Sequence, residues 1–140
     1  MGFAVALSRS EADERYIVDV YSAGNVAAFV SRIGNYGQFQ TINRCEGRRN
    51  LYRDANVFDD SQVEHAQVYL NKGDLLVLCS DGVKQRTNGS LSWKLPIYQG
   101  GEALCDYCTS IIGSGSQVKT GNQRIPLVFD DRSVLGHKVI

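Results

Sequence analysis

The chain has 140 residues, of which 43% are hydrophobic and 21% are charged. These values exclude a disordered or fibrous protein, and the length suits a single domain over residues 1–140. The 15 basic and 15 acidic residues cancel, so the composition provides no general attraction to nucleic acid or to anionic lipid. No run approaches the ~20 apolar residues of a membrane helix, and no signal peptide is recognisable. We therefore expect a cytoplasmic protein without nucleic-acid or membrane partners.

The first half of the chain has the composition of short antiparallel strands. Residues 3–7 form an apolar run, and residues 16–21 and 26–30 are rich in β-branched and aromatic side chains. Ser22-Ala23-Gly24-Asn25 is a hairpin signal, and Gly34-Asn35-Tyr36-Gly37 is a second one. The charged residues between the first two runs are predicted to form a turn over 8–15. These patterns predict a meander of about four strands.

A polar segment of 22 residues, 43–64, follows the meander and carries Arg44, Arg48, Arg49 and Arg53. A stretch of this length without strand or helix periodicity is long for a compact domain, which is typical of a functional flap. A solvated loop is the simpler interpretation. Whether these arginines bind phosphate stays open at this point.

The second half contains two further strands and a helix. Residues 65–70 alternate between apolar and polar, and residues 75–79 are entirely apolar. After Val83 the sequence is polar and irregular, and the periodicity then predicts a helix over 102–112, followed by a flexible loop. Residues 133–140 are predicted to form the last strand.

The four cysteines include one pair with metal or redox spacing, Cys105 and Cys108. A zinc site normally needs a second pair, which Cys45 and Cys79 do not form. The helical spacing of the apolar residues places Cys108 on a buried stripe. We therefore interpret the pair as structural, with a redox or zinc role as the alternative.

Two acidic turns follow buried strands. Asp81 comes directly after the apolar run 75–79, and Asp130 and Asp131 come directly after Leu127-Val128-Phe129. Short carboxylates at the ends of two strands would repel each other unless a hard cation such as Mg²⁺ or Mn²⁺ bound between them. An Asp-Gly dipeptide is also a common turn, so spacing alone does not distinguish a metal site from a turn.

The sequence on both sides of these aspartates distinguishes a metal site from an ordinary turn. The segment LNKGDLLVLCSDGV, residues 70–83, resembles the Gly-Asp turn, apolar strand and Ser-Asp-Gly motif of the metal-dependent protein phosphatases, the protein phosphatase 2C family. The segment DDRSVL, residues 130–135, is similar to the last motif of that family. The predicted helix fits between the two motifs, and the hairpin 16–30 looks like the strands around the family's Gly-Asp-Ser turn.

The resemblance implies an α+β fold, an antiparallel β-sandwich with a flanking helix. It implies hydrolysis of phosphoserine or phosphothreonine through a water activated by two or more Mg²⁺ or Mn²⁺ ions. Asp81 and Asp130 match metal ligands of the family, and Asp131 is the neighbouring candidate. No catalytic acid is carried over, and His65 and His137 match no motif, so we interpret them as ordinary strand or surface residues.

The resemblance covers the carboxy-terminal half of the family's domain. The family's amino-terminal ligands have no match here, and its Gly-Asp-Ser turn reads Ala23-Gly24-Asn25. A phosphatase would therefore need a second chain or a missing segment to complete the fold, and its partner would be a phosphoprotein substrate. The alternative is a catalytically inactive phosphatase-like module that binds a regulatory protein. A third reading is an all-β scaffold whose Asp-Gly turns are only turns.

Overall fold

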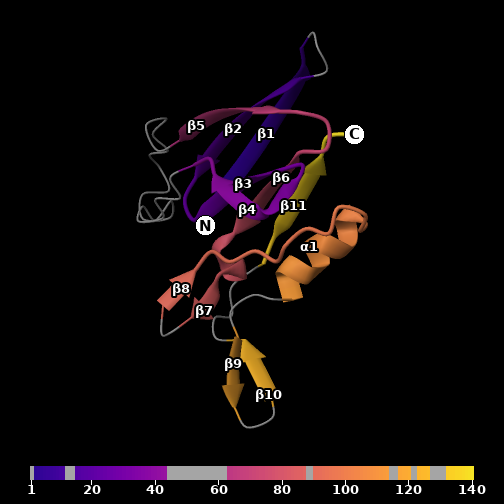
Figure 1. Ribbon diagram of the computed structural model, residues 1–140. Helices are drawn as coiled ribbons and strands as arrows, with labels where there is room; N and C mark the ends of the chain where they lie inside the picture. The colour runs from indigo at the N-terminus through magenta and orange to yellow at the C-terminus, as the bar shows by residue number, and fades with distance from the viewer. Residues whose placement is uncertain are drawn as a thin grey trace.

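The structure is a computed structural model that describes residues 2–11, 15–43, 63–87, 90–113, 117–120, 123–126 and 132–140. In this part of the chain, two antiparallel sheets pack on each other, and one helix lies beside the second sheet (Figure 1). This arrangement confirms the predicted α+β sandwich with a flanking helix. No helix in the described ranges is long and apolar enough to cross a membrane.

The first sheet, called sheet A here, has the strand order β1-β2-β5. Its strands are β1 (Phe3–Ser10), β2 (Tyr16–Ala23) and β5 (Glu64–Leu70). The predicted turn over residues 8–15 is wrong in its first half, because Ser8, Arg9 and Ser10 continue β1 and pair with β2. Backbone pairing with a strong neighbour strand outweighs their polar side chains.

The second sheet, sheet B, has the order β11-β6-β3-β4. Its strands are β3 (Val26–Arg32), β4 (Asn35–Thr41), β6 (Leu75–Ser80) and β11 (Val134–Lys138). The turn from β2 into β3 contains Gly24, whose φ of 80° lies in the left-handed region that favours glycine. The predicted hairpin at this turn, and with it the four-strand meander, is wrong, because β2 pairs with β1 and β5 whereas β3 pairs with β4 and β6. The turn instead carries the chain from sheet A into sheet B.

The apolar residues form two cores, one on each face of sheet B. The first core lies between the sheets and contains Val18, Val20, Ala28, Val30, Val68, Leu70, Leu76, Leu78 and Val139. The second lies on the other face and contains Ala27, Phe29, Leu75, Val77, Cys79, Val83, Tyr98, Tyr107 and Ile111. Strand β6 contributes to both cores, which explains why its sequence is a continuous apolar run.

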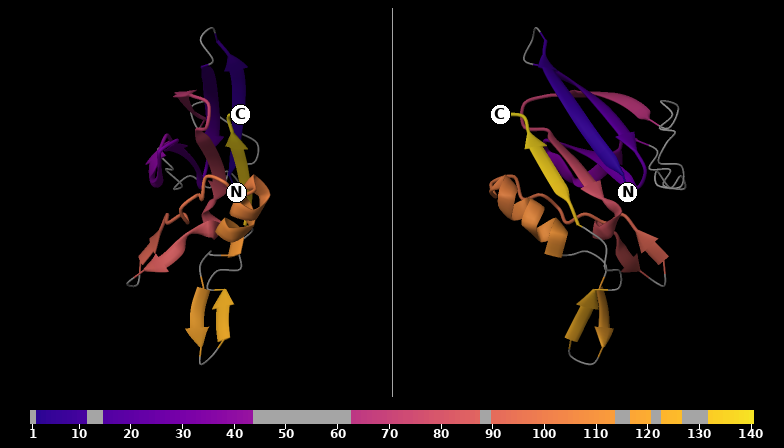
Figure 2. Two further views of the ribbon diagram at one scale, coloured as in Figure 1. Left: turned by 45° about the vertical axis from the view of Figure 1, so that its right-hand side comes forward. Right: turned by 180° about the vertical axis from the view of Figure 1, so that it is seen from behind.

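The helix α1 (Leu104–Gly113) covers the second core through Tyr107 and Ile111, which are both buried. It lies along β11 (Figure 2) at Gly136, where an added Cβ would come within 2.9 Å of Cys108 Sγ and 3.0 Å of Leu104 Cδ1. Gly136 interrupts the apolar pattern of β11 because the helix packs directly against the backbone there.

Two short hairpins were not predicted. The chain has β7 (Gln85–Thr87) with β8 (Ser90–Ser92), and β9 (Gln117–Thr120) with β10 (Gln123–Pro126). The expectation of an irregular segment after Val83 is therefore wrong for these two strands and holds from residue 93 to 103, and the expected loop after the helix is wrong where β9 and β10 form. Both hairpins have two-residue connections, Asn88-Gly89 and Gly121-Asn122, which are hairpin signals in the sequence.

Candidate functional site

Three separate segments meet at one end of sheet B. The Asp81 N–H donates to Asn25 O at 3.1 Å, so the β2–β3 turn lies beside the end of β6. On the other side, the Ser80 N–H donates to Ser133 O at 3.0 Å, and the Ser133 N–H donates to Ser80 Oγ at 2.9 Å. These bonds fix the backbone of the Ser-Asp-Gly motif from both neighbouring strands.

Asp81 is placed by a change of backbone conformation at the end of β6. Ser80 is extended, and Asp81 begins the short 3₁₀ helix η3 (Asp81–Val83), closed by a hydrogen bond from the Lys84 N–H to Asp81 O at 3.0 Å. Gly82 and Val83 are buried, which anchors the turn to the second core, whereas Asp81 is half-buried. A half-buried carboxylate on a fixed turn is suited to binding a cation.

Asp130 and Asp131 lie outside the described residues, as do Arg44, Arg48, Arg49 and Arg53. The two residues that follow the aspartates are described. Ser133 is bonded to Ser80, and Arg132 Nη1 donates to Ile112 O at 3.0 Å, near the carboxyl end of α1. The start of β11 is therefore held beside the Asp81 turn, where the resemblance predicts that the two motifs meet.

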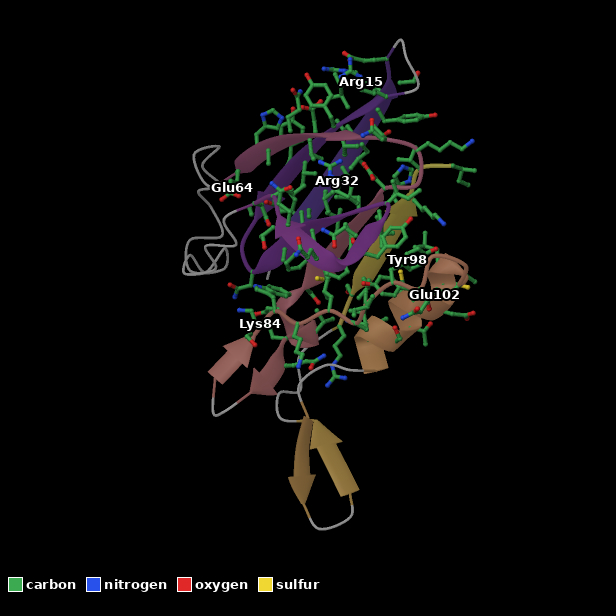
Figure 3. All side chains as sticks on the ribbon, in the orientation of Figure 1. Arg15, Arg32, Glu64, Lys84, Tyr98 and Glu102 are labelled. Atoms are coloured by element: carbon green, nitrogen blue, oxygen red, sulfur yellow. The ribbon has the colours of Figure 1, made fainter. Side chains whose placement is uncertain are left out.

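A second carboxylate of the resembling segment, Asp74, lies at the opposite end of β6 and is buried. It accepts hydrogen bonds from Arg32 Nη1 at 2.7 Å, from the Ile33 N–H at 3.0 Å and from the Asn71 N–H at 2.8 Å. Burial alone would raise the pKa of Asp74, but these bonds outweigh it and lower the pKa below its ordinary value. Arg32 (labelled in Figure 3) also donates to Tyr69 O, so this ion pair ties sheet B to sheet A.

A polar cluster on sheet A contains His65, one of the two histidines that matched no motif. Asp19 Oδ1 accepts from Gln67 Nε2 at 2.8 Å and lies 2.8 Å from His65 Nε2, while the His65 ring stacks on Tyr21. Hydrogen bonds from Gln67 and His65 lower the pKa of Asp19 below its ordinary value. His65 and His137 are both exposed strand residues, as expected.

The described residues bring no three His, Cys, Asp or Glu side chains close enough together to share one metal ion. Cys105 and Cys108 therefore belong to no such group in these ranges. Cys105 is exposed, Cys108 is half-buried against β11, and both are free thiols. Burial raises the pKa of Cys108, which suits the predicted structural role.

The sequence did not single out the backbone partners that shape the site, Asn25, Ser80 and Ser133. The only signal was their place in the motifs, since Ser80 precedes Asp81 and Ser133 follows Arg132. Asn43 was also missed. It is buried, donates to Ser22 Oγ and Val26 O, and accepts from the Ala28 N–H, so it secures the strand that follows the β2–β3 turn.

The fold is similar to that of a known phosphatase domain. The phosphatase domain of the cell fate determinant SpoIIE from Bacillus subtilis, in a Mn-presoaked form, aligns with a TM-score of 0.54 at 17% sequence identity. The alignment covers 98% of this chain and 56% of the SpoIIE chain. The chain has part of a protein phosphatase 2C-like fold. It therefore spans little more than half the length of the SpoIIE phosphatase domain.

A second structure of the SpoIIE phosphatase domain aligns with a TM-score of 0.49 at 15% identity, covering 97% of this chain and 58% of that one. No protein-family profile and no curated protein sequence matches the chain. The likeness to the Mn-presoaked SpoIIE structure concerns the fold alone, and it confirms the protein phosphatase 2C-like architecture that the motifs predicted.

Proposed function

We propose that this chain is part of a metal-dependent protein serine/threonine phosphatase. The observation that carries the proposal is the hydrogen-bonded meeting of Asn25, the Ser80-Asp81 turn and Ser133 in a protein phosphatase 2C-like fold. That meeting joins the two segments whose sequences resemble the metal-binding motifs of the family. The proposed substrate is a phosphoprotein with phosphoserine or phosphothreonine.

Asp81, Asp130 and Asp131 are the residues proposed to hold Mg²⁺ or Mn²⁺. The donor type fits, because both ions prefer carboxylate oxygens and water. The half-buried position of Asp81 on a turn bonded to both neighbouring strands also fits, since the carboxylate needs little reorganisation to bind. Bound metal would supply an activated water and electrostatic stabilisation of the transferring phosphoryl group.

Three aspartates do not complete the coordination of two ions that each prefer six ligands. We propose that further ligands come from a second polypeptide or from a segment outside this sequence, which corresponds to the share of the SpoIIE domain that this chain does not cover. Within this chain, Asp81 binds and orients, and the Ser80–Ser133 hydrogen bonds hold the two motifs together. We assign no general acid to the chain.

The proposed compartment is the cytoplasm. Cys105 and Cys108 on α1 are free thiols. Reduced cysteines are the usual state in the cytosol, where glutathione and thioredoxin oppose disulfide formation.

Calorimetric titration with Mn²⁺ tests the site without relying on activity. The wild-type chain is expected to show saturable binding, and Asp130→Ala is expected to weaken it at least tenfold. Asp106→Ala removes an exposed carboxylate from α1 and serves as the matched control, with unchanged binding. Equal binding by wild type and Asp130→Ala would reject the assigned ligands.

Hydrolysis of a phosphothreonine peptide with Mn²⁺, measured with the chain alone and with a candidate partner, tests the reaction itself. Turnover that depends on Asp130 supports the phosphatase. Mn²⁺ binding without turnover in any combination would favour the second candidate, a phosphatase-like module without catalysis. The observation that favours this candidate is the exposed apolar face of sheet A, which includes Val5, Leu7 and Tyr69.

A further inference from the structure

The two cysteines of helix α1 have different surroundings. Cys105 lies in the first turn of the helix and is exposed, and its thiol donates to Asp106 Oδ1 at the long distance of 3.9 Å. Cys108 lies nearly one turn later and is half-buried, where the helix packs on the backbone of Gly136 in β11 (Figure 1). One thiol of the pair is therefore open to solvent, and the other is part of the contact between the helix and the sheet.

The helix brings the two thiols to a spacing from which a disulfide can form. Residues three positions apart in an α-helix have Cα atoms about 5 Å apart, because the rise is ~1.5 Å per residue and the Cα radius is ~2.3 Å. Disulfides span Cα distances of roughly 4.4–6.8 Å, so the backbone spacing is suitable. The Cβ atoms, about 5–6 Å apart, exceed the ~4.5 Å upper limit of a disulfide, so the first turn of the helix must tighten for the bond to form.

The surroundings also assign the two thiols different roles in an oxidation. The thiolate is the form that attacks a peroxide, and exposure decides which sulfur the oxidant reaches. Burial raises the pKa of Cys108, a hydrogen bond from the Gly136 N–H opposes this effect in part, and the nearby Cys105 adds to the rise. Cys108 therefore stays protonated and packed while the exposed Cys105 meets the oxidant.

We propose that Cys105 and Cys108 form a thiol pair that a hydroperoxide oxidises to a reversible disulfide, and that this bond loosens α1 on β11. In the reduced chain Cys108 Sγ lies directly on Gly136, where an added Cβ would come within 2.9 Å of it. A sulfur bonded to Cys105 must turn toward the first turn of the helix and leave this contact. The reduced Cys108 has the structural role that the sequence predicted, and oxidation removes that role.

The reaction has two balanced steps. The Cys105 thiolate attacks one oxygen of the hydroperoxide, the O–O bond breaks, and the other oxygen takes up a proton and leaves as an alcohol or as water. Cys105 is then a sulfenic acid. Cys108 Sγ next attacks Cys105 Sγ, the S–O bond breaks, and the hydroxide leaves as water with the Cys108 proton. The two thiols lose two electrons, which the peroxide bond takes up, and a dithiol reverses the reaction. A disulfide of this kind is compatible with the cytosol, where disulfides are usually transient.

Peptide mass spectrometry of the full chain after treatment with hydrogen peroxide tests the chemistry. Trypsin leaves both thiols in one peptide, residues 95–119, and the buried Cys79 in another, residues 73–84. The peptide 95–119 is expected to lose two hydrogen atoms at a rate independent of protein concentration, and to regain them with dithiothreitol. The peptide 73–84 is the internal control and is expected to react at least tenfold more slowly. A disulfide to another cysteine or to a second chain, or a sulfinic acid on Cys105 without a disulfide, would overturn the proposal.

Two single variants separate the roles of the thiols. Cys105→Ser changes an exposed side chain and is expected to abolish the reaction, with Cys108 unmodified at the same peroxide concentration. Cys108→Ser is expected to retain the sulfenic acid on Cys105, which dimedone labels, and to form sulfinic acid at least tenfold faster than wild type does. Equal rates of sulfinic acid formation in wild type and Cys108→Ser would show that Cys108 does not trap the sulfenic acid.

Amide hydrogen exchange of the reduced and oxidised chains tests the loosening of the helix. Exchange within α1 is expected to be at least tenfold faster in the oxidised chain, because Cys108 has left Gly136, whereas exchange within β2 stays unchanged. Equal exchange of α1 in the two states would overturn the link between oxidation and the packing of the helix. The inference goes beyond the proposed hydrolysis and does not depend on it. None of these readouts involves Mn²⁺ or phosphatase activity, so failure here is distinguishable from failure of the proposed function.

Discussion

The two ends of strand β6 each carry an aspartate next to a glycine, and the two carboxylates have different surroundings. Asp74, at the beginning, is buried and accepts three hydrogen bonds, one of them from Arg32. Asp81, at the end, is half-buried on a turn whose backbone is held by neighbouring strands. The comparison teaches that burial and main-chain donors make the Asp74 carboxylate part of the fold, whereas the position of the half-buried Asp81 is set by the backbone bonds of its turn.

The largest expected effect comes from Asp74→Ala. Removing this buried carboxylate leaves the Ile33 and Asn71 N–H groups without their acceptor and Arg32 without its ion pair. We expect the free energy of unfolding to fall by about 2–4 kcal/mol, with the upper range of buried pairs reduced because Arg32 is partly exposed. Urea unfolding measures this, with Asp106→Ala as the control at less than ~0.5 kcal/mol. A loss below ~1 kcal/mol for Asp74→Ala would show that Asp74 does not stabilise the fold more than Asp81 does.

The pH dependence of stability sharpens the same contrast. The pKa of Asp74 is lower in the folded chain than in the unfolded one, so the unfolded state binds more protons in acid. The contribution of Asp74 is therefore complete above its unfolded pKa of ~3.9 and is lost as the pH falls through the folded value. Urea unfolding from pH 6 to pH 2 is expected to show a smaller acid loss in Asp74→Asn than in wild type. Parallel curves would contradict this account.

At the other end, Asp81→Asn is expected to affect ligand binding and leave folding nearly intact. The proposed Mn²⁺ affinity should fall at least tenfold, because an amide is a weaker ligand than a carboxylate. The free energy of unfolding should change by less than ~1 kcal/mol, since the turn is held by backbone bonds to Asn25 and Lys84. Titration calorimetry and urea unfolding of one protein sample measure both. Unchanged Mn²⁺ affinity would show that the two ends of β6 do not differ in this way.

The smallest expected effect is that of Gly136→Ala, midway along β11. The added Cβ would crowd Cys108 Sγ and Leu104 Cδ1, and the leucine tip can move aside, so we expect a loss of about 1 kcal/mol. Thermal unfolding measures it. The Mn²⁺ affinity should stay unchanged, because the substitution lies away from both ends of β6, and a tenfold fall would show that the position of α1 controls the site.

The sequence predicted the central parts of the fold well. Strands β2, β3 and β6, the turn between β2 and β3, and helix α1 follow directly from apolar periodicity and turn residues, and the motif order identified the fold class. The pairing of β2 with β3 was predicted wrongly, because a turn signal does not show that the chain passes from one sheet to the other. Periodicity failed for β7–β8 and β9–β10, because these strands are short and mostly polar. Their Asn88-Gly89 and Gly121-Asn122 connections were the better signal.

The candidate site was predictable in its residue types and less so in its geometry. Asp81 could be named because it follows a buried strand in a recognisable motif. The hydrogen bonds from Asp81 to Asn25 and between Ser80 and Ser133 could not, because they join residues more than 50 positions apart through sheet pairing. The same limit applied to Asp74, whose partner Arg32 lies in a different strand and whose role is set by burial.

The buried thiol of Cys79 allows the rate at which sheet B opens to be measured. Cys79 is 2% exposed in the middle of the molecule, whereas Cys105 is exposed on α1. A thiol reagent can reach Cys79 only when the strands beside it separate, so its labelling rate reports how often the central sheet opens. Metal bound at the proposed site would slow that labelling, and the chain thus carries its own kinetic reporter of site occupancy.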